Sequence, residues 1–193
     1  DNHRDNTLTQ MRFSRGENIV VDGFTFRGGF GDTSANCGFY NFGGGLFAFF
    51  SEYEVRNCTF ERNGANNGGA LASPDGSMAR ILGSDFLENT GVPVPFRTGA
   101  GEIVESEGSG AGVYMISGPA PENDAWFQNC RFIGNEKGAA LSNIGGSPTI
   151  VGSLFAHNRY RLAAISDSST GGSDATFINC TVVNNIGEGF SSY

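Results

Sequence analysis

The chain is poor in basic residues, and lysine is almost absent. Its 193 residues include 12 basic and 20 acidic side chains, which give a net charge of −8, and Lys137 is the sole lysine. Nucleic acids and anionic membrane surfaces bind proteins through basic patches, so neither is expected as a partner. No apolar run approaches the roughly 18 residues of a membrane-spanning helix, so no span is expected.

Metal-binding residues are also scarce. The only histidines are His3 and His157, and the four cysteines include no Cys-x-x-Cys pair. Structural zinc sites use such residues, so no zinc site and no other cofactor is predicted. An acidic group at Glu102, Glu105 and Glu107 could recruit a cation, although a solvated loop is the simpler interpretation.

Long helical stripes are missing, whereas short repeats are abundant. A pattern of about 25 residues recurs six times, and such a period indicates a solenoid. A phenylalanine marks each copy, and an asparagine follows it three residues later. The phenylalanines are Phe26, Phe60, Phe86, Phe132 and Phe155, with Val182 in the last copy. The asparagines are Asn63, Asn89, Asn135, Asn158 and Asn185, with Gly29 in the first copy.

Three more columns accompany these two. An apolar residue begins each copy, a small residue lies two places before the phenylalanine except in the first copy, which has Phe24, and a small-residue signature such as Ala70-Leu71 or Ala140-Leu141 follows the asparagine. Between the first two columns every copy has glycine or asparagine, at Gly23, Asn57, Gly83, Asn129, Gly152 and Asn179. These residue types tolerate left-handed backbone angles best, so a tight bend is predicted there.

The residue types decide between solenoid classes. Leucine-rich repeats have a similar period, but they need a leucine ladder and a helical half. Here the ladder is phenylalanine, and the second half is glycine and alanine. A single all-β domain over 1–193, a parallel β-helix of about six coils, is therefore predicted. Equivalent side chains would stack about 4.8 Å apart, and the asparagines would hydrogen-bond from coil to coil.

The motifs "GFTFRGG", "NCTFERN…GGALAS", "NCRFIGN…GAALSN" and "SLFAHN…AAIS" resemble the FxxN and GGA[I/L/V] repeats of extracellular right-handed β-helix proteins. The polymorphic outer-membrane proteins of chlamydiae carry both motifs. This resemblance covers about residues 18–193 and implies a right-handed helix used as a passenger or stalk. The chain departs from that pattern at Leu162–Ile165 and Gly187–Phe190, where the GGA motif is degraded, and in its recurring cysteines.

The cysteines fit the same columns. Cys58, Cys130 and Cys180 are each two coils from the next, about 9–10 Å apart, and a disulfide needs Cα atoms within about 7 Å. They are therefore predicted to be free core residues. Cys37 lies in an insertion, where it could pair with Cys58 or with another chain. The sequons at Asn57 and Asn179 are possible glycosylation sites, and a structural bend asparagine is the alternative.

Two insertions, 27–43 and 90–125, interrupt the coils, and partner contacts are expected there because variable loops on a rigid stack carry binding. The candidate contact residues are Phe39, Tyr40, Phe42, Phe96 and Trp126. Both chain ends lack a visible cap, so the chain is expected to be a processed piece of a longer β-helix or a unit that stacks end to end.

Catalysis is the main alternative, because parallel β-helices include pectate lyases and polygalacturonases. Glycosidases need two carboxylates about 5 to 9.5 Å apart. The acids here are scattered; Glu61 and Glu88 could lie within about 5 to 6 Å on neighbouring coils, although surface acids on a β-helix are usually solvated. His157, beside Arg159, is interpreted as a surface residue. The prediction is a non-catalytic extracellular structural or adhesive β-helix that contacts proteins, including copies of itself, or surface glycans; a polysaccharide-binding or polysaccharide-cleaving protein is the alternative.

Overall fold

The computed structural model describes residues 7–8, 11–15, 17–31, 42–74, 76–92, 94–97, 103–106, 108–116, 125–144, 146–167 and 175–192. For 7–8, 94–97, 103–106, 161–167 and 188–192 it describes the backbone alone. Every element in these ranges is a β-strand. Within them there is no helix that could cross a membrane.

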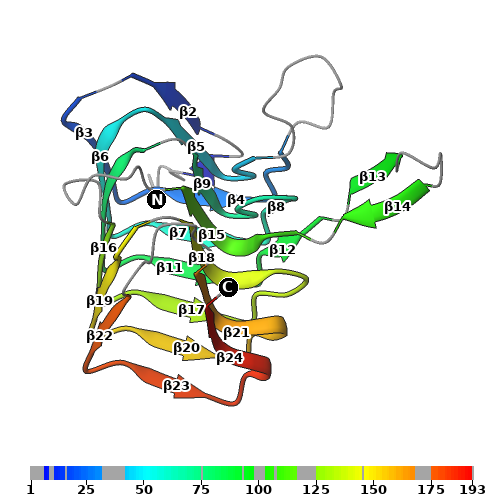
Figure 1. Cartoon of the computed structure of the whole chain (residues 1–193). Coiled ribbons are helices and arrows are strands. Elements are labelled where there is room, and N and C mark those ends of the chain that lie inside the picture. Colours follow the sequence, from blue (N-terminus) through cyan, green and yellow to red (C-terminus); the bar gives the residue numbers. More distant parts are fainter. Residues whose placement is uncertain are drawn as a thin grey trace, which may run out of the picture.

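Three parallel sheets form the body of the molecule (Figure 1). Sheet I contains β3 (Ile19–Asp22), β6 (Glu52–Arg56), β10 (Met78–Leu82), β16 (Trp126–Gln128), β19 (Thr149–Val151) and β22 (Thr176–Ile178). Sheet II contains β1 (Thr7–Leu8), β4 (Thr25–Arg27), β7 (Thr59–Glu61), β11 (Asp85–Leu87), β17 (Arg131–Ile133), β20 (Leu154–Ala156) and β23 (Thr181–Val183). Sheet III contains β2 (Met11–Ser14), β5 (Leu46–Phe49), β9 (Leu71–Ser73), β15 (Gly110–Ile116), β18 (Ala139–Ile144), β21 (Arg159–Asp167) and β24 (Ile186–Ser192).

The chain passes through sheets I, II and III in turn and then begins the next coil. Six such coils follow one another, and β1 and β2 form part of an earlier turn that pairs with β4 and β5. Two short strands, β8 (Gly64–Ala65) and β12 (Thr90–Gly91), add a parallel pair beside sheet III. The strand β13 (Val94–Arg97) pairs antiparallel with β14 (Ile103–Ser106) in a hairpin that projects from the stack (Figure 1). The predicted parallel β-helix is confirmed.

The phenylalanine column fills the interior against sheet II. Consecutive rings from Phe26 to Phe155 lie in register, with centroids 4.7, 5.0, 4.8 and 4.6 Å apart and planes within 7° of parallel. All five rings are fully buried. Val182 continues the column in the last coil, opposite Phe155. The strand spacing brings these rings into van der Waals contact, so each coil buries the ring of its neighbour.

The asparagine column satisfies the backbone at the second bend. From Asn63 to Asn158 the backbone amide and Nδ2 of each asparagine donate to Oδ1 of the next asparagine, as Asn89 does to Asn135 at 3.1 and 3.0 Å. Nδ2 also donates to a phenylalanine carbonyl of the previous coil, for example from Asn89 to Phe60 at 3.0 Å. Buried polar groups need such partners, and this ladder supplies them from Asn63 to Asn185.

Both bends depend on left-handed backbone angles. The glycine or asparagine of the first bend has φ between 52° and 74° in all six coils. At the second bend the left-handed residue is the one before the ladder position, and it includes Arg62, Glu88 and His157. A side chain with a Cβ pays a steric cost in this region, whereas glycine does not.

Replacing His157 with glycine is therefore expected to stabilise the fold by about 0.5–1 kcal/mol, after allowance for the greater freedom of glycine in the unfolded chain. His157 is exposed and has φ 55°. The matched control is Gly134→Ala, at the same bend position one coil earlier with φ 67°, which is expected to destabilise by about 1 kcal/mol. Urea unfolding measures both, and a lower midpoint for His157→Gly would contradict the prediction.

The described cysteines are free, with Cys58 and Cys130 buried and Cys180 partly buried. Cys37 lies outside the described residues. Burial raises the pKa of Cys130 to about 11, from an ordinary value of 9.0. Burial also raises the pKa of Cys58 and of the Tyr53 hydroxyl. These groups therefore resist deprotonation in the folded chain.

Alkaline pH is expected to destabilise the fold through Cys130. The pKa of its thiol is higher in the folded chain than in the unfolded chain, so the unfolded chain loses the proton first as the pH rises. The free energy of unfolding is therefore unaffected by this thiol below about pH 9 and falls as the pH rises toward about 11. The loss is about 3 kcal/mol. Unfolding midpoints measured from pH 7 to 11 should fall less steeply in Cys130→Ser than in the parent chain, and equal slopes would contradict this cause.

The second predicted insertion needs correction, because 90–125 is not one loop. Thr90–Gly91 pairs with β8, and β15 (Gly110–Ile116) lies within sheet III between β9 and β18. The cause is the small-residue column: a Cβ on Gly112 would lie 2.2 Å from the Ala140 carbonyl oxygen, so this segment packs against the next coil. In the first insertion, 27–43, Arg27 belongs to β4, and Phe30 and Phe42 form bridges with coil 2.

Candidate interaction surface

The five predicted contact aromatics have different environments. Phe39 and Tyr40 lie outside the described residues, and Phe96 belongs to β13, whose side chains are not described. Phe42 is partly buried on the outer face of sheet III, with its ring centroid 6.3 Å from Phe47 and 5.7 Å from Tyr114. Trp126 lies on sheet I with 37% of its surface exposed.

Four of the nine large apolar side chains that are exposed in the described structure lie on the strands of sheet I. Trp126 belongs to an outward row that crosses the strands in register, and its neighbours in order are Val20, Glu54 and Arg80. Val20, Met78 and Ile178 on this sheet are also exposed. Outer positions of an exposed strand are ordinarily polar, so exposed apolar residues on one face suggest a surface that meets a partner.

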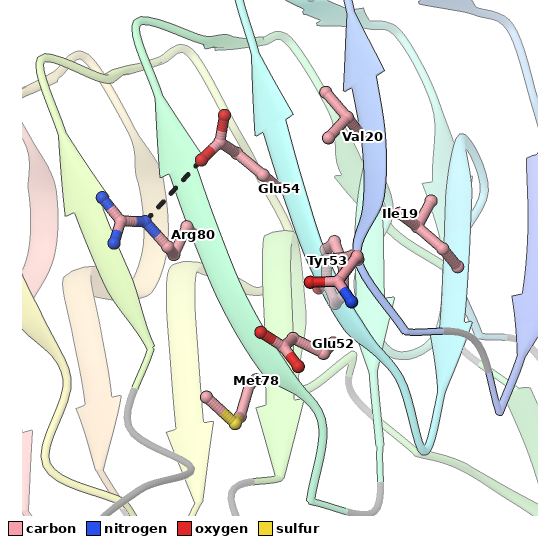
Figure 2. Close-up of a pocket in the computed structure, with 8 residues that line it drawn as sticks. Ile19, Val20, Glu52, Tyr53, Glu54, Met78 and Arg80 are labelled. Carbon is pink, nitrogen blue, oxygen red and sulfur yellow. Dashed lines mark ion pairs between the residues drawn. The ribbon is translucent and has the colours of Figure 1, made fainter.

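A shallow groove of about 180 Å³ crosses β3, β6 and β10 beside this row (Figure 2). Val20 and Met78 supply apolar walls, and the carboxylates of Glu52 and Glu54 and the guanidinium of Arg80 supply polar ones (Figure 2). A second hollow shares Glu52 and Met78. Apolar walls with a few polar groups are usual for a binding groove.

The charges of this face are largely paired. Glu54 accepts from Arg56 at 3.3 Å and lies 3.7 Å from Arg80. Arg56 also lies 2.9 Å from Asp22. Hydrogen bonds from Asn57 and then Arg56 lower the pKa of Asp22. Glu52 forms no ion pair within the described structure, which leaves its carboxylate available to a partner.

Glu61 and Glu88, the two acids that could approach on neighbouring coils, do not lie directly opposite each other. Glu61 lies opposite Leu87, and Glu88 is one residue further, at the second bend. Arg62 bridges the two acids, 3.4 Å from Glu61 and 2.8 Å from Glu88, and Arg27 holds Glu61 from the other side at 2.7 Å. These carboxylates are neutralised by arginines from the same and neighbouring coils.

Other candidate residues are dispersed. No group of three His, Cys, Asp or Glu side chains that could hold a metal ion occurs among the described residues, and the side chains of the acidic loop 102–107 are not described. His157 is exposed at the second bend. Asn57 and Asn179 are exposed at the first bend, where Nδ2 of Asn57 donates to Asp22 at 3.0 Å.

The sheet I row and groove were not predicted from the sequence. A signal existed, because Val20 and Met78 occupy outward positions in strands that otherwise alternate buried and exposed residues. The groove itself depends on side chains of three coils, from positions 18 to 80, that only the coil register brings together.

These observations define a class, the three-sheet parallel β-solenoid with a filled interior. The family described as "Right handed beta helix region" matches residues 2–193. The chain belongs to this right-handed β-helix family. No curated protein matches it.

Proposed function

We propose that the chain is a non-catalytic structural and adhesive β-helix that works outside the cell and uses the open face of sheet I for contact. The observation that carries this proposal is that charged outer side chains of neighbouring coils pair with one another, whereas sheet I keeps exposed apolar side chains and a carboxylate that forms no ion pair within the described structure. The interior is filled by ladders, and on the outside arginines bridge acids of neighbouring coils, as Arg131 does with Asp85. On sheet I, Trp126 and the carboxylate of Glu52 remain open, and Arg80, although it lies 3.7 Å from Glu54, keeps 65% of its side chain exposed.

The residue types support an interface. Tryptophan, methionine and arginine are enriched where proteins meet, and a few such residues carry most of the binding energy.

Polysaccharide binding is the second candidate. Trp126 and Arg80 are neighbours on adjacent strands of sheet I, where an indole ring can stack on a sugar and a guanidinium can hold a hydroxyl or carboxylate. The coil spacing of about 4.8 Å would let an extended polymer contact successive coils. A cleaving enzyme would in addition need a free acid and base at the bound chain.

The test is a binding screen of the labelled chain on glycan and cell-surface protein arrays, with a parallel assay for polysaccharide turnover. For any ligand found, Trp126→Ala is expected to weaken binding at least about tenfold, which is the size of an interface hot spot. Val183→Ser, an exposed apolar position on sheet II, is the matched control and is expected to have no effect. Turnover of a polysaccharide would overturn the non-catalytic proposal, and equal losses for both variants would overturn the assignment of the surface.

A further inference from the structure

The first bend alternates between two residue pairs along five consecutive coils. Coils 2, 4 and 6 carry asparagine followed by cysteine, and coils 3 and 5 carry glycine followed by serine. We name these Asn–Cys and Gly–Ser coils. Their pairs are Asn57-Cys58, Gly83-Ser84, Asn129-Cys130, Gly152-Ser153 and Asn179-Cys180.

The serine hydroxyl of each Gly–Ser coil accepts a hydrogen bond from a backbone amide of the coil before it. The buried amide of Cys58 donates to Ser84 Oγ at 3.2 Å, and that of Cys130 donates to Ser153 Oγ at 3.1 Å. The Ser153 hydroxyl in turn donates to the Val151 carbonyl at 3.1 Å. A thiol accepts hydrogen bonds poorly, so cysteine in place of serine would leave the amide of the preceding coil without a good acceptor.

The glycine of each Gly–Ser coil makes room for the asparagine before it. A Cβ on Gly83 would lie 3.3 Å from Asn57 Oδ1, and a Cβ on Gly152 would lie 2.7 Å from Asn129 Oδ1. Gly23 follows no such asparagine in the described structure, and its Cβ position is open. The asparagine carboxamide therefore covers the bend of the following coil.

We propose that the first-bend rim of an Asn–Cys coil is a recognition surface that selects a Gly–Ser coil as its next neighbour. Asn179 and Cys180 present this surface on the last described coil. The partner that fits it is a parallel β-coil with Gly-Ser at the first bend and asparagine at the second, whose Oδ1 would accept from Asn185 as Asn185 accepts from Asn158. This inference rests on the proposed scaffold function, because it names the coil that a growing stack accepts.

The experiment appends a second copy of residues 168–193 after Tyr193 in two versions. One copy is unchanged and so presents an Asn–Cys coil, and the other carries Asn179→Gly and Cys180→Ser within the copy alone. The Gly–Ser copy is expected to raise the denaturation midpoint above that of the parent chain, and to slow the reaction of the original Cys180 with a thiol reagent at least about tenfold. An equal or greater rise with the unchanged copy, or an unaltered Cys180 rate, would overturn the proposal.

Two single substitutions test the same rule inside the stack. Ser153→Cys removes the acceptor of the Cys130 amide, whereas Cys130→Ser keeps it. The unfolding equilibrium constant of Ser153→Cys is expected to be at least about ten times that of Cys130→Ser, because a buried amide without an acceptor destabilises the folded state. The opposite order overturns the rule. None of these measurements depends on ligand binding by sheet I, so failure here and failure of the adhesive function are separate results.

Discussion

Replacement of Asn89 by alanine is expected to lower the free energy of unfolding by about 3–5 kcal/mol. Asn89 Oδ1 accepts from both the backbone amide and Nδ2 of Asn63, at 3.0 and 3.1 Å, and all of these groups are buried. The substitution removes that acceptor and also the Nδ2 donor to the Phe60 carbonyl. Each buried N–H group left without a partner costs about 1–3 kcal/mol. The substitution orphans the Asn63 amide and one of the two Nδ2 hydrogens of Asn63, whose nitrogen keeps its bond to the Phe26 carbonyl at 3.0 Å, and these losses account for most of the expected effect.

The adjacent residue supplies the control. Glu88→Ala removes an exposed ion pair with Arg62 at the same bend and is expected to cost at most about 1 kcal/mol. Asn89→Asp separates the two roles of the side chain, because it keeps an acceptor for Asn63 and loses the donor to Phe60. Urea unfolding measures all three variants. If Asn89→Ala costs no more than Glu88→Ala, the ladder does not stabilise the stack as inferred.

Much of the interior could be predicted from the sequence because a solenoid converts sequence period into spatial contact. Once Phe60 and Phe86 occupy equivalent places in consecutive copies, a parallel ladder of about 4.8 Å spacing leaves them no arrangement except stacking. The same logic places Asn63 beside Asn89. The bend after sheet I could also be predicted from the sequence, because glycine and asparagine alternate at one position and both tolerate left-handed backbone angles.

The outer surface could not be predicted in the same way. Outward residues differ from coil to coil, so no repeated residue type in the sequence indicates which of them will be in contact. Their contacts depend on the register at each bend. Glu88 is the left-handed residue of its own bend, equivalent to Arg62 one coil earlier, and Arg62 forms ion pairs with both Glu61 and Glu88. Phe42 packs against Phe47 and Tyr114, which belong to two strands of sheet III, and no repeat specifies these contacts.

Ion pairs between neighbouring coils relate the composition of the sequence to the outer surface of the structure. Arginine is the basic residue that bridges the described coils, and its planar fork holds carboxylates at fixed geometry better than lysine does. Asp22, Glu61 and Asp85 each meet an arginine of an adjacent coil. The scarcity of lysine in the sequence therefore has a structural counterpart: nearly all of the positive charge is carried by the residue type that can bridge coils. These exposed pairs add little energy individually, so the interior columns dominate stability.

Replacement of Phe132 by alanine is expected to cost about 3–5 kcal/mol, the range for deleting a buried phenylalanine. The ring lies between Phe86 and Phe155 at 4.8 and 4.6 Å and is fully buried, so its loss leaves a cavity that fixed neighbouring coils cannot close. Val182→Ala is the matched control, because this position continues the same column but is 42% exposed, and it is expected to cost below about 1 kcal/mol. Thermal or urea unfolding distinguishes the two, and similar losses at both positions would show that the column is not the interior support of the stack.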